Sequence, residues 1–138
     1  MSTILLVDSD VDARTILRSA LTHDGFRVIE APDGDEAVRM LTEHDVRLVV
    51  GELYVRAREG DLFLPALKTH PRARDLLVMV VSTQGYSDAR TAATAGGADA
   101  FFVKPCELLV MRSAVRRLLG MEGAAQANGS GRANIPLN

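Results

Sequence analysis

Polar residues that could act together stand at the ends of short apolar runs. They are Asp8, Glu52, Ser82 and Lys104, and the runs before them are residues 4–7, 48–51, 77–81 and 101–103. Apolar runs of this length are typical of β-strands that are buried on both faces. The carboxyl ends of parallel strands meet at one edge of a sheet, where open α/β sheets bind their ligands. The sequence therefore predicts a crevice in which carboxylate, hydroxyl and ammonium groups gather around Glu52.

The rest of the chain supplies the elements that would position this edge. Predicted strands over 3–7, 26–31, 48–53, 76–81 and 100–103 alternate with predicted helices over 11–23, 35–43, 61–69, 85–95 and 106–119. This alternation indicates a parallel sheet with helices on both faces. With right-handed crossovers, we predict a flavodoxin-like (βα)5 three-layer sandwich whose five-stranded sheet has the order 2-1-3-4-5. Strands 1 and 3 are neighbours in this order, so Asp8 and Glu52 would lie side by side. Asp10 is predicted to cap the first helix.

Composition limits the function classes that the chain can serve. Its 138 residues are 47% apolar and 25% charged, which suits one globular domain. We predict that this domain covers residues 1–119 and that 120–138, which has few large apolar residues, is a flexible tail. The formal net charge of −2 gives no general electrostatic case for nucleic acid, and no apolar run approaches a membrane-spanning length. Cys106, the sole cysteine, and the lack of a signal peptide point to a reducing cytoplasm.

The order and spacing of these motifs resemble the receiver domain of two-component response regulators. The resemblance covers roughly residues 2–119. Its marks are the strand and acidic residue at 4–8, Glu52 eight residues before Gly60, Ser82-Thr83, and the segment 97–105. The last segment is the most specific, and the marks together are strong where each alone is weak.

The resemblance implies a role for each matching residue. Asp8 would help to hold Mg²⁺, and Glu52 occupies the position at which the family phosphorylates an aspartate. Ser82 and Lys104 would contact the phosphoryl group. Residues with conformational roles in the family correspond to Phe101, which turns inward on activation, and Pro105, whose preceding peptide bond is typically cis.

Two residues depart from the pattern of the family. Ser9 stands where the family has its second metal-binding acid, which removes a charge and a strong Mg²⁺ ligand. Glu52 is longer than aspartate by one methylene, which moves its carboxylate by about 1 Å or more. Phosphoryl transfer depends on positioning and electrostatic stabilisation. We therefore expect Mg²⁺ binding at Asp8 and Glu52 to be weak or lost, and phosphorylation to be lost or very slow.

The sequence leaves open what Glu52 does instead. Its carboxylate could pair with Lys104 where a phosphoryl oxygen would lie in the family, and so hold an active-like state. The rival interpretation is a degenerate site that stays inactive-like. Glutamate carries one charge where a phosphoryl group carries nearly two, so mimicry is often incomplete.

The favoured interpretation is a stand-alone receiver that is not an enzyme and signals by protein–protein association without phosphorylation. Its expected partners are a histidine kinase or a downstream effector, and a homodimer is left open. The candidate contact residues are Tyr86, Arg90, Val110, Met111 and Arg112. The alternative is a working Mg²⁺-dependent phosphoacceptor in a phosphorelay. An enzyme or nucleotide binder on the same fold is disfavoured, because no glycine-rich phosphate-binding turn follows the first strand.

Overall fold

The apolar runs form the strands of one sheet in the computed structural model, which describes residues 2–52, 67, 70–82, 97–103 and 108–120. The elements in chain order are β1 (Thr3–Val7), α1 (Val11–His23), β2 (Arg27–Ala31), α2 (Gly34–Glu43), β3 (Leu48–Glu52), the 3₁₀ turn η2 (Ala73–Asp75), β4 (Leu77–Ser82), β5 (Ala100–Val103) and α5 (Leu108–Leu118).

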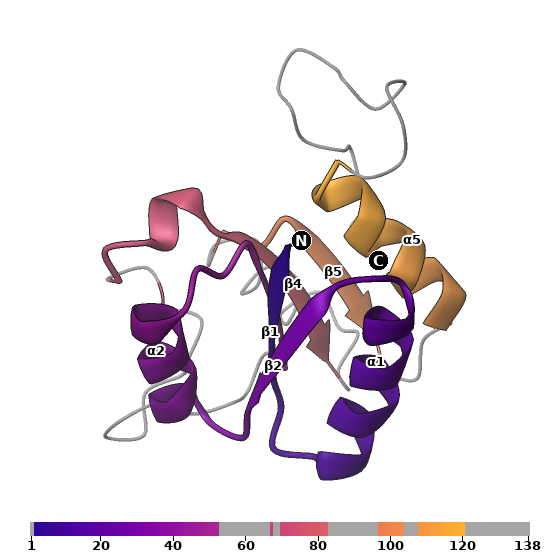
Figure 1. The fold of residues 1–138 in the computed structure, drawn as a ribbon, viewed down its shortest axis with the longest axis horizontal. Helices are drawn as coiled ribbons and strands as arrows, with labels where there is room; N and C mark the ends of the chain where they lie inside the picture. Colours follow the sequence, from indigo (N-terminus) through magenta and orange to yellow (C-terminus); the bar gives the residue numbers. More distant parts are fainter. Residues whose placement is uncertain (1, 53–66, 68–69, 83–96, 104–107, 121–138) are drawn as a thin grey trace.

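The five strands lie in the order β2-β1-β3-β4-β5, and every neighbouring pair is parallel (Figure 1). The predicted strand order is therefore confirmed. Val7 of β1 pairs with Gly51 of β3, and Glu52 pairs with Val81 of β4. This register brings the carboxyl ends of β1, β3 and β4 to the same edge of the sheet.

Alternate residues of the central strands point to opposite faces of the sheet, where they pack in two separate apolar cores. On one face, Val49 packs in a core that includes Leu41 of α2. On the other face, Val50 packs in a core that includes Leu21 of α1 and Val115 of α5. Figure 1 shows α2 on one side of the sheet and α1 with α5 on the other. The predicted arrangement of helices on both faces of the sheet is thus confirmed.

The described elements begin and end where local sequence signals place them. The bounds of the five strands and of α1 and α2 differ from the predicted ones by at most one residue. Asp33 caps α2 by accepting a hydrogen bond from the Glu36 amide at 2.9 Å. Gly25 lies in the turn that follows α1 and has a φ of 95°, a conformation that glycine adopts without steric cost. The turn η2 was not predicted.

Several predictions fall on residues outside the described ranges. The predicted helix over 61–69 is described only at Leu67, which is helical and buried. The predicted helix over 85–95, the start of the predicted last helix at Cys106, and all of the predicted tail over 120–138 except Gly120 lie outside them. Within the described ranges, no helix is long and apolar enough to cross a membrane.

Candidate functional site

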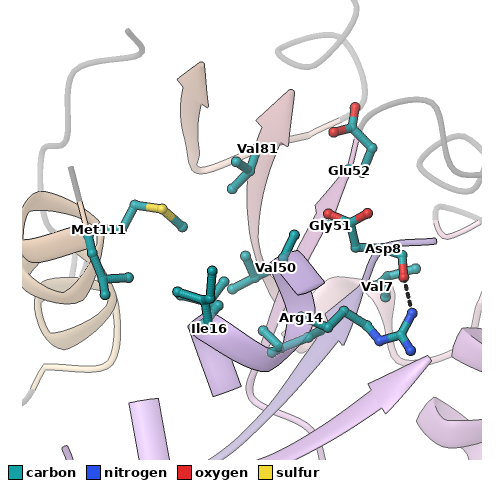
Figure 2. A pocket seen from close by; sticks show the side chains of 13 residues that line it. Val7, Asp8, Arg14, Ile16, Val50, Gly51, Glu52, Val81 and Met111 are labelled. Atoms are coloured by element: carbon teal, nitrogen blue, oxygen red, sulfur yellow. Dashed lines mark hydrogen bonds between the residues drawn. The ribbon is translucent and has the colours of Figure 1, made fainter. Parts of the chain in front are cut away.

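Two carboxylates lie side by side where β1 and β3 end. Asp8 directly follows β1, Glu52 is the last residue of β3, and both are half-buried. Figure 2 shows the two side chains at the end of neighbouring strands. The Asp8 amide donates to the carbonyl oxygen of Ala31 at 3.2 Å, and its Oδ1 atom accepts from the Asp10 amide at 2.9 Å. The predicted juxtaposition of Asp8 and Glu52 is confirmed.

Asp10 acts at the start of α1, as predicted. Its carboxylate accepts hydrogen bonds from the amides of Asp12 at 3.0 Å and Ala13 at 3.4 Å. A capping carboxylate satisfies amides that have no partner within the helix. The predicted capping role of Asp10 is therefore confirmed.

Arg14 belongs to the site although the sequence did not point to it. Its Nη1 atom donates to the backbone carbonyl oxygen of Asp8 (Figure 2). Its Nε atom donates to Glu30 Oε1 at 3.2 Å. Its side chain is 13% exposed. Arg14 lies four residues after the helix cap, but its partner Glu30 lies 16 positions further on, so sequence spacing alone gives no signal of this contact.

A cavity of about 410 Å³ adjoins the two carboxylates. Asp8, Arg14 and Glu52 line its polar rim, and apolar side chains from α1, the sheet and α5 form its walls. Figure 2 shows Ile16 of α1 between Met111 of α5 and Val50 of β3 in this view, and all three side chains line the cavity. The site is therefore a hollow between the two helices on this face of the sheet rather than a flat edge.

Ser82 and Phe101, which the resemblance implicated in switching, are fully buried. Ser82 is the last residue of β4, next to Val81, which pairs with Glu52. Phe101 lies in β5 and packs in the core that α2 covers. The predicted site residues that lie outside the described ranges, and so remain predictions, are Lys104, Pro105, Tyr86 and Arg90.

The structure corrects the predicted partner surface on α5. Met111 is 4% exposed and packs in the core between the sheet, α1 and α5, so it does not lie on the surface. The signal for its burial is the apolar stripe Met111, Ala114, Val115 and Leu118, which recurs at helical spacing. Val110 is 45% exposed, in agreement with a surface position, and the neighbouring Leu109 is 67% exposed.

Arg112, the third predicted contact on α5, forms an ion pair within the domain. Its Nε atom donates to Asp24 Oδ2 at 2.8 Å, its Nη2 atom donates to Oδ1, and Arg116 approaches the same carboxylate at 3.3 Å. Asp24 follows α1, and its side chain is 7% exposed. The Arg112 guanidinium holds the pKa of Asp24 below its ordinary value, although burial acts in the opposite direction. This ion pair ties α5 to the end of α1.

The described residues do not fit the strong Mg²⁺ site that the fold family implies. No cluster of three or more His, Cys, Asp or Glu side chains able to hold a metal occurs within the described ranges. Asp8 and Glu52 supply two carboxylates, and Ser9 replaces the third. Mg²⁺ prefers several oxygen ligands in near-octahedral geometry.

Comparison with known protein families and sequences gives a consistent result. Residues 4–116 match the family described as the response regulator receiver domain. The chain is 30% identical over 118 residues to the probable chemotaxis protein CheY of Rhizobium etli. This match covers 85% of this chain and 92% of that protein. It is 32% identical to the transcriptional regulatory protein PrrA of Mycobacterium tuberculosis, over 92% of this chain but only 54% of that protein. The chain thus spans about half the length of this second relative.

Solved structures share the fold. A response regulator from Desulfuromonas acetoxidans superposes with a TM-score of 0.79 at 23% identity, over 89% of this chain and all of that one. The receiver domain of Ssk1 from Saccharomyces cerevisiae, crystallised with the histidine phosphotransfer protein Ypd1, gives a TM-score of 0.74 at 17% identity. That match covers 84% of this chain and 87% of the other. At these identities the likeness concerns the fold alone, and the predicted flavodoxin-like class is confirmed.

Proposed function

Since the chain belongs to the response regulator receiver domain family, we propose that it is a receiver that signals by binding other proteins without being phosphorylated. The observation that carries the proposal is the identity of the residue at the end of β3. Glu52, and not an aspartate, lies beside Asp8 at the edge where the family carries its phosphoacceptor. Ser9 adds a second departure at the same edge.

The geometry around Glu52 argues against phosphoryl transfer. β3 is paired on both sides, to β1 and to β4, so its backbone is held in place. A longer side chain on a fixed strand must carry its carboxylate away from the position that an aspartate would occupy. Misplacing a nucleophile by about 1 Å costs roughly a hundredfold in rate. With two carboxylates and a serine at the edge, the charge that would attract Mg²⁺ is also reduced.

The burial of Phe101 supports an active-like state that needs no phosphoryl group. In the family, the aromatic residue at this position turns inward on activation, and Phe101 is fully buried. A carboxylate at position 52 supplies a permanent negative charge at the end of β3. We propose that this charge takes the place of the phosphoryl group in favouring the inward position.

We propose that signalling proteins, namely a histidine kinase or a downstream effector, bind the α5 side of the domain. Leu109 and Val110 are large apolar residues that remain exposed on α5. The fully buried core of a protein–protein interface is more apolar than the rest of the protein surface, so these two side chains are suited to lie in such a core. Among the structural relatives, the Ssk1 receiver was crystallised with its histidine phosphotransfer protein.

Intact mass spectrometry after incubation with a small phosphodonor and Mg²⁺ tests the proposal. We expect the wild-type chain to gain no phosphoryl adduct. The double variant Ser9→Asp/Glu52→Asp restores both acids and should gain one, since the fold supplies the remaining positions. A stoichiometric adduct on the wild-type chain would overturn the proposal.

A phosphoacceptor in a phosphorelay is the second candidate function. It is favoured by Asp8 and Ser82, which occupy the family's positions at the ends of β1 and β4. In that case, the wild-type chain would be modified, and the single variant Glu52→Gln would not be. The same mass measurement on these two proteins separates the candidates.

A further inference from the structure

Arg14 is a cation that both lines the cavity and contacts the backbone of an acidic site residue. It joins three elements: it belongs to α1, it donates to the carbonyl oxygen of Asp8 after β1 (Figure 2), and it donates to Glu30 in β2. Two such hydrogen bonds use the fork of the guanidinium group, which holds partners in fixed directions. At 13% exposure, the side chain is largely withdrawn from solvent.

The backbone of Asp8 is held at both of its hydrogen-bonding groups. Its amide donates to the carbonyl oxygen of Ala31, and its carbonyl oxygen accepts from Arg14. The Cα atom between these two groups carries the carboxylate, so fixing both groups limits the directions in which the carboxylate can point. The hydrogen bond from the Asp10 amide to Asp8 Oδ1 then selects one of these directions.

We propose that Arg14 is a positioning residue, which keeps the Asp8 carboxylate beside Glu52 by holding the Asp8 carbonyl oxygen. Glu30 keeps the guanidinium in place, so β2 contributes to the site without reaching it. This inference rests on the proposed function only in taking Asp8 and Glu52 as the site. It holds whether or not the wild-type chain is phosphorylated.

Arg18 provides a matched control. It contacts the same carboxylate as Arg14, with its Nε atom 3.4 Å from Glu30 Oε2, and its side chain is 50% exposed. Arg18, like Arg14, belongs to α1, so the variant Arg18→Gln removes one of the two arginines that contact Glu30. The hydrogen bond from Arg14 to Asp8 remains in this variant, so a general effect of charge removal on α1 is separated from an effect on Asp8.

The first test uses nuclear magnetic resonance on the wild-type chain and on single variants of it. The proton of the Asp10 amide reports on the Asp8 carboxylate that accepts from it. In Arg14→Gln, we expect this proton to shift upfield, because the hydrogen bond weakens when the Asp8 carboxylate moves. In Arg18→Gln, we expect it to stay in place. An unchanged Asp10 resonance in Arg14→Gln would overturn the proposal.

The second test measures Mg²⁺ affinity by titration calorimetry in the Ser9→Asp/Glu52→Asp background. Residues that orient metal ligands without touching the metal themselves typically contribute 10- to 100-fold to metal affinity. We expect Arg14→Gln to weaken Mg²⁺ binding about tenfold or more and Arg14→Lys to rescue little of it, because lysine lacks the fork. We expect Arg18→Gln to change the affinity by less than about twofold. Arg14→Gln that lowers the melting temperature but leaves Mg²⁺ affinity unchanged contradicts the positioning role.

The two tests separate the failure of this inference from the failure of the proposed function. If the restored double variant binds no Mg²⁺, the explanation that Ser9 and Glu52 weaken the metal site is wrong. The Asp10 resonance in the wild-type background then decides the role of Arg14 by itself.

Discussion

Glu52 differs from an aspartate by one methylene, and the surrounding sheet gives this small change its effect. Gly51 before it is buried and pairs with Val7, while Glu52 itself pairs with Val81. Because the strand is hydrogen-bonded on both sides, it cannot retreat to compensate for a longer side chain. The added length must therefore appear at the carboxylate, at the rim of the cavity.

The burial of Phe101 predicts that truncating its side chain lowers the stability of the domain. It is fully buried in the core that α2 covers. Phe101→Ala should lower the free energy of unfolding by about 3–5 kcal/mol, because it leaves a cavity as well as losing apolar contacts. Urea denaturation followed by circular dichroism measures this loss.

The matched variant at this position is Phe101→Leu, which keeps most of the apolar volume. It should cost less than about 1.5 kcal/mol. Equal, small losses in both variants would mean that the side chain is not packed in the core, and would remove the support that its burial gives to an active-like state.

At the scale of the elements, the ion pair between Asp24 and α5 makes stability depend on pH. Asp24 is 7% exposed, and its pKa lies below the ordinary value of 3.8 because Arg112 donates to it. A depressed pKa gives stability that is fully present above the unfolded-state pKa of about 3.9 and is lost as the pH falls through the folded-state pKa. Asp24→Asn should therefore cost about 2 kcal/mol at pH 7 and much less at pH 2.

Urea denaturation of the wild-type chain and of Asp24→Asn at these two pH values measures this dependence. Asp45→Asn is the control, since Asp45 pairs with Arg72 but is 89% exposed. Ion pairs at such exposed positions typically contribute less than about 1 kcal/mol. A difference between wild type and Asp24→Asn that stays constant from pH 7 to pH 2 would contradict the proposed cause.

Truncating two adjacent residues of α5 should change the stability of the domain to very different extents. Met111 is buried between the sheet and α1, so Met111→Ala should lower the free energy of unfolding by about 2–5 kcal/mol. Val110 is 45% exposed, so Val110→Ala should change it by less than about 0.5 kcal/mol. Denaturation of the two variants in parallel compares them directly. A large loss in Val110→Ala would show that this residue supports the fold and is a poor choice for testing partner binding.

Local signals made most of the elements predictable, but not the contacts that complete the site. β1 and β5 have the predicted bounds because an apolar run fixes both ends, and α1 begins where Asp10 caps it. The pairs Arg14–Glu30 and Arg112–Asp24 join residues 16 and 88 positions apart. Their formation depends on how helices and strands pack, which no local pattern specifies. The prediction that Met111 is a surface contact is wrong for a different reason: the apolar stripe that buries Met111 is a local pattern, and the prediction does not rest on that pattern.

At the scale of the whole molecule, one sheet separates two cores, and the site lies where the sheet, α1 and α5 meet. The cavity has walls from all three of these elements, so its shape depends on how α1 and α5 are held relative to each other. The Asp24 ion pair holds the far end of α1 to α5, and Arg14 holds the near end to β1 and β2. The two arginine contacts thus act on opposite ends of the same helix.

The placement of the cores predicts that the folded domain does not need the C-terminal 18 residues. The described buried core residues run from Ile4 to Leu118, and Leu119 packs against them. A chain that ends at Gly120 should therefore keep its free energy of unfolding within about 0.5 kcal/mol and keep the same urea dependence, because that dependence scales with the surface exposed on unfolding. A chain that ends at Ala114 loses Val115 and Leu118 and should not unfold cooperatively. A loss of more than about 1 kcal/mol in the chain that ends at Gly120 would mean that residues 121–138 pack on the domain.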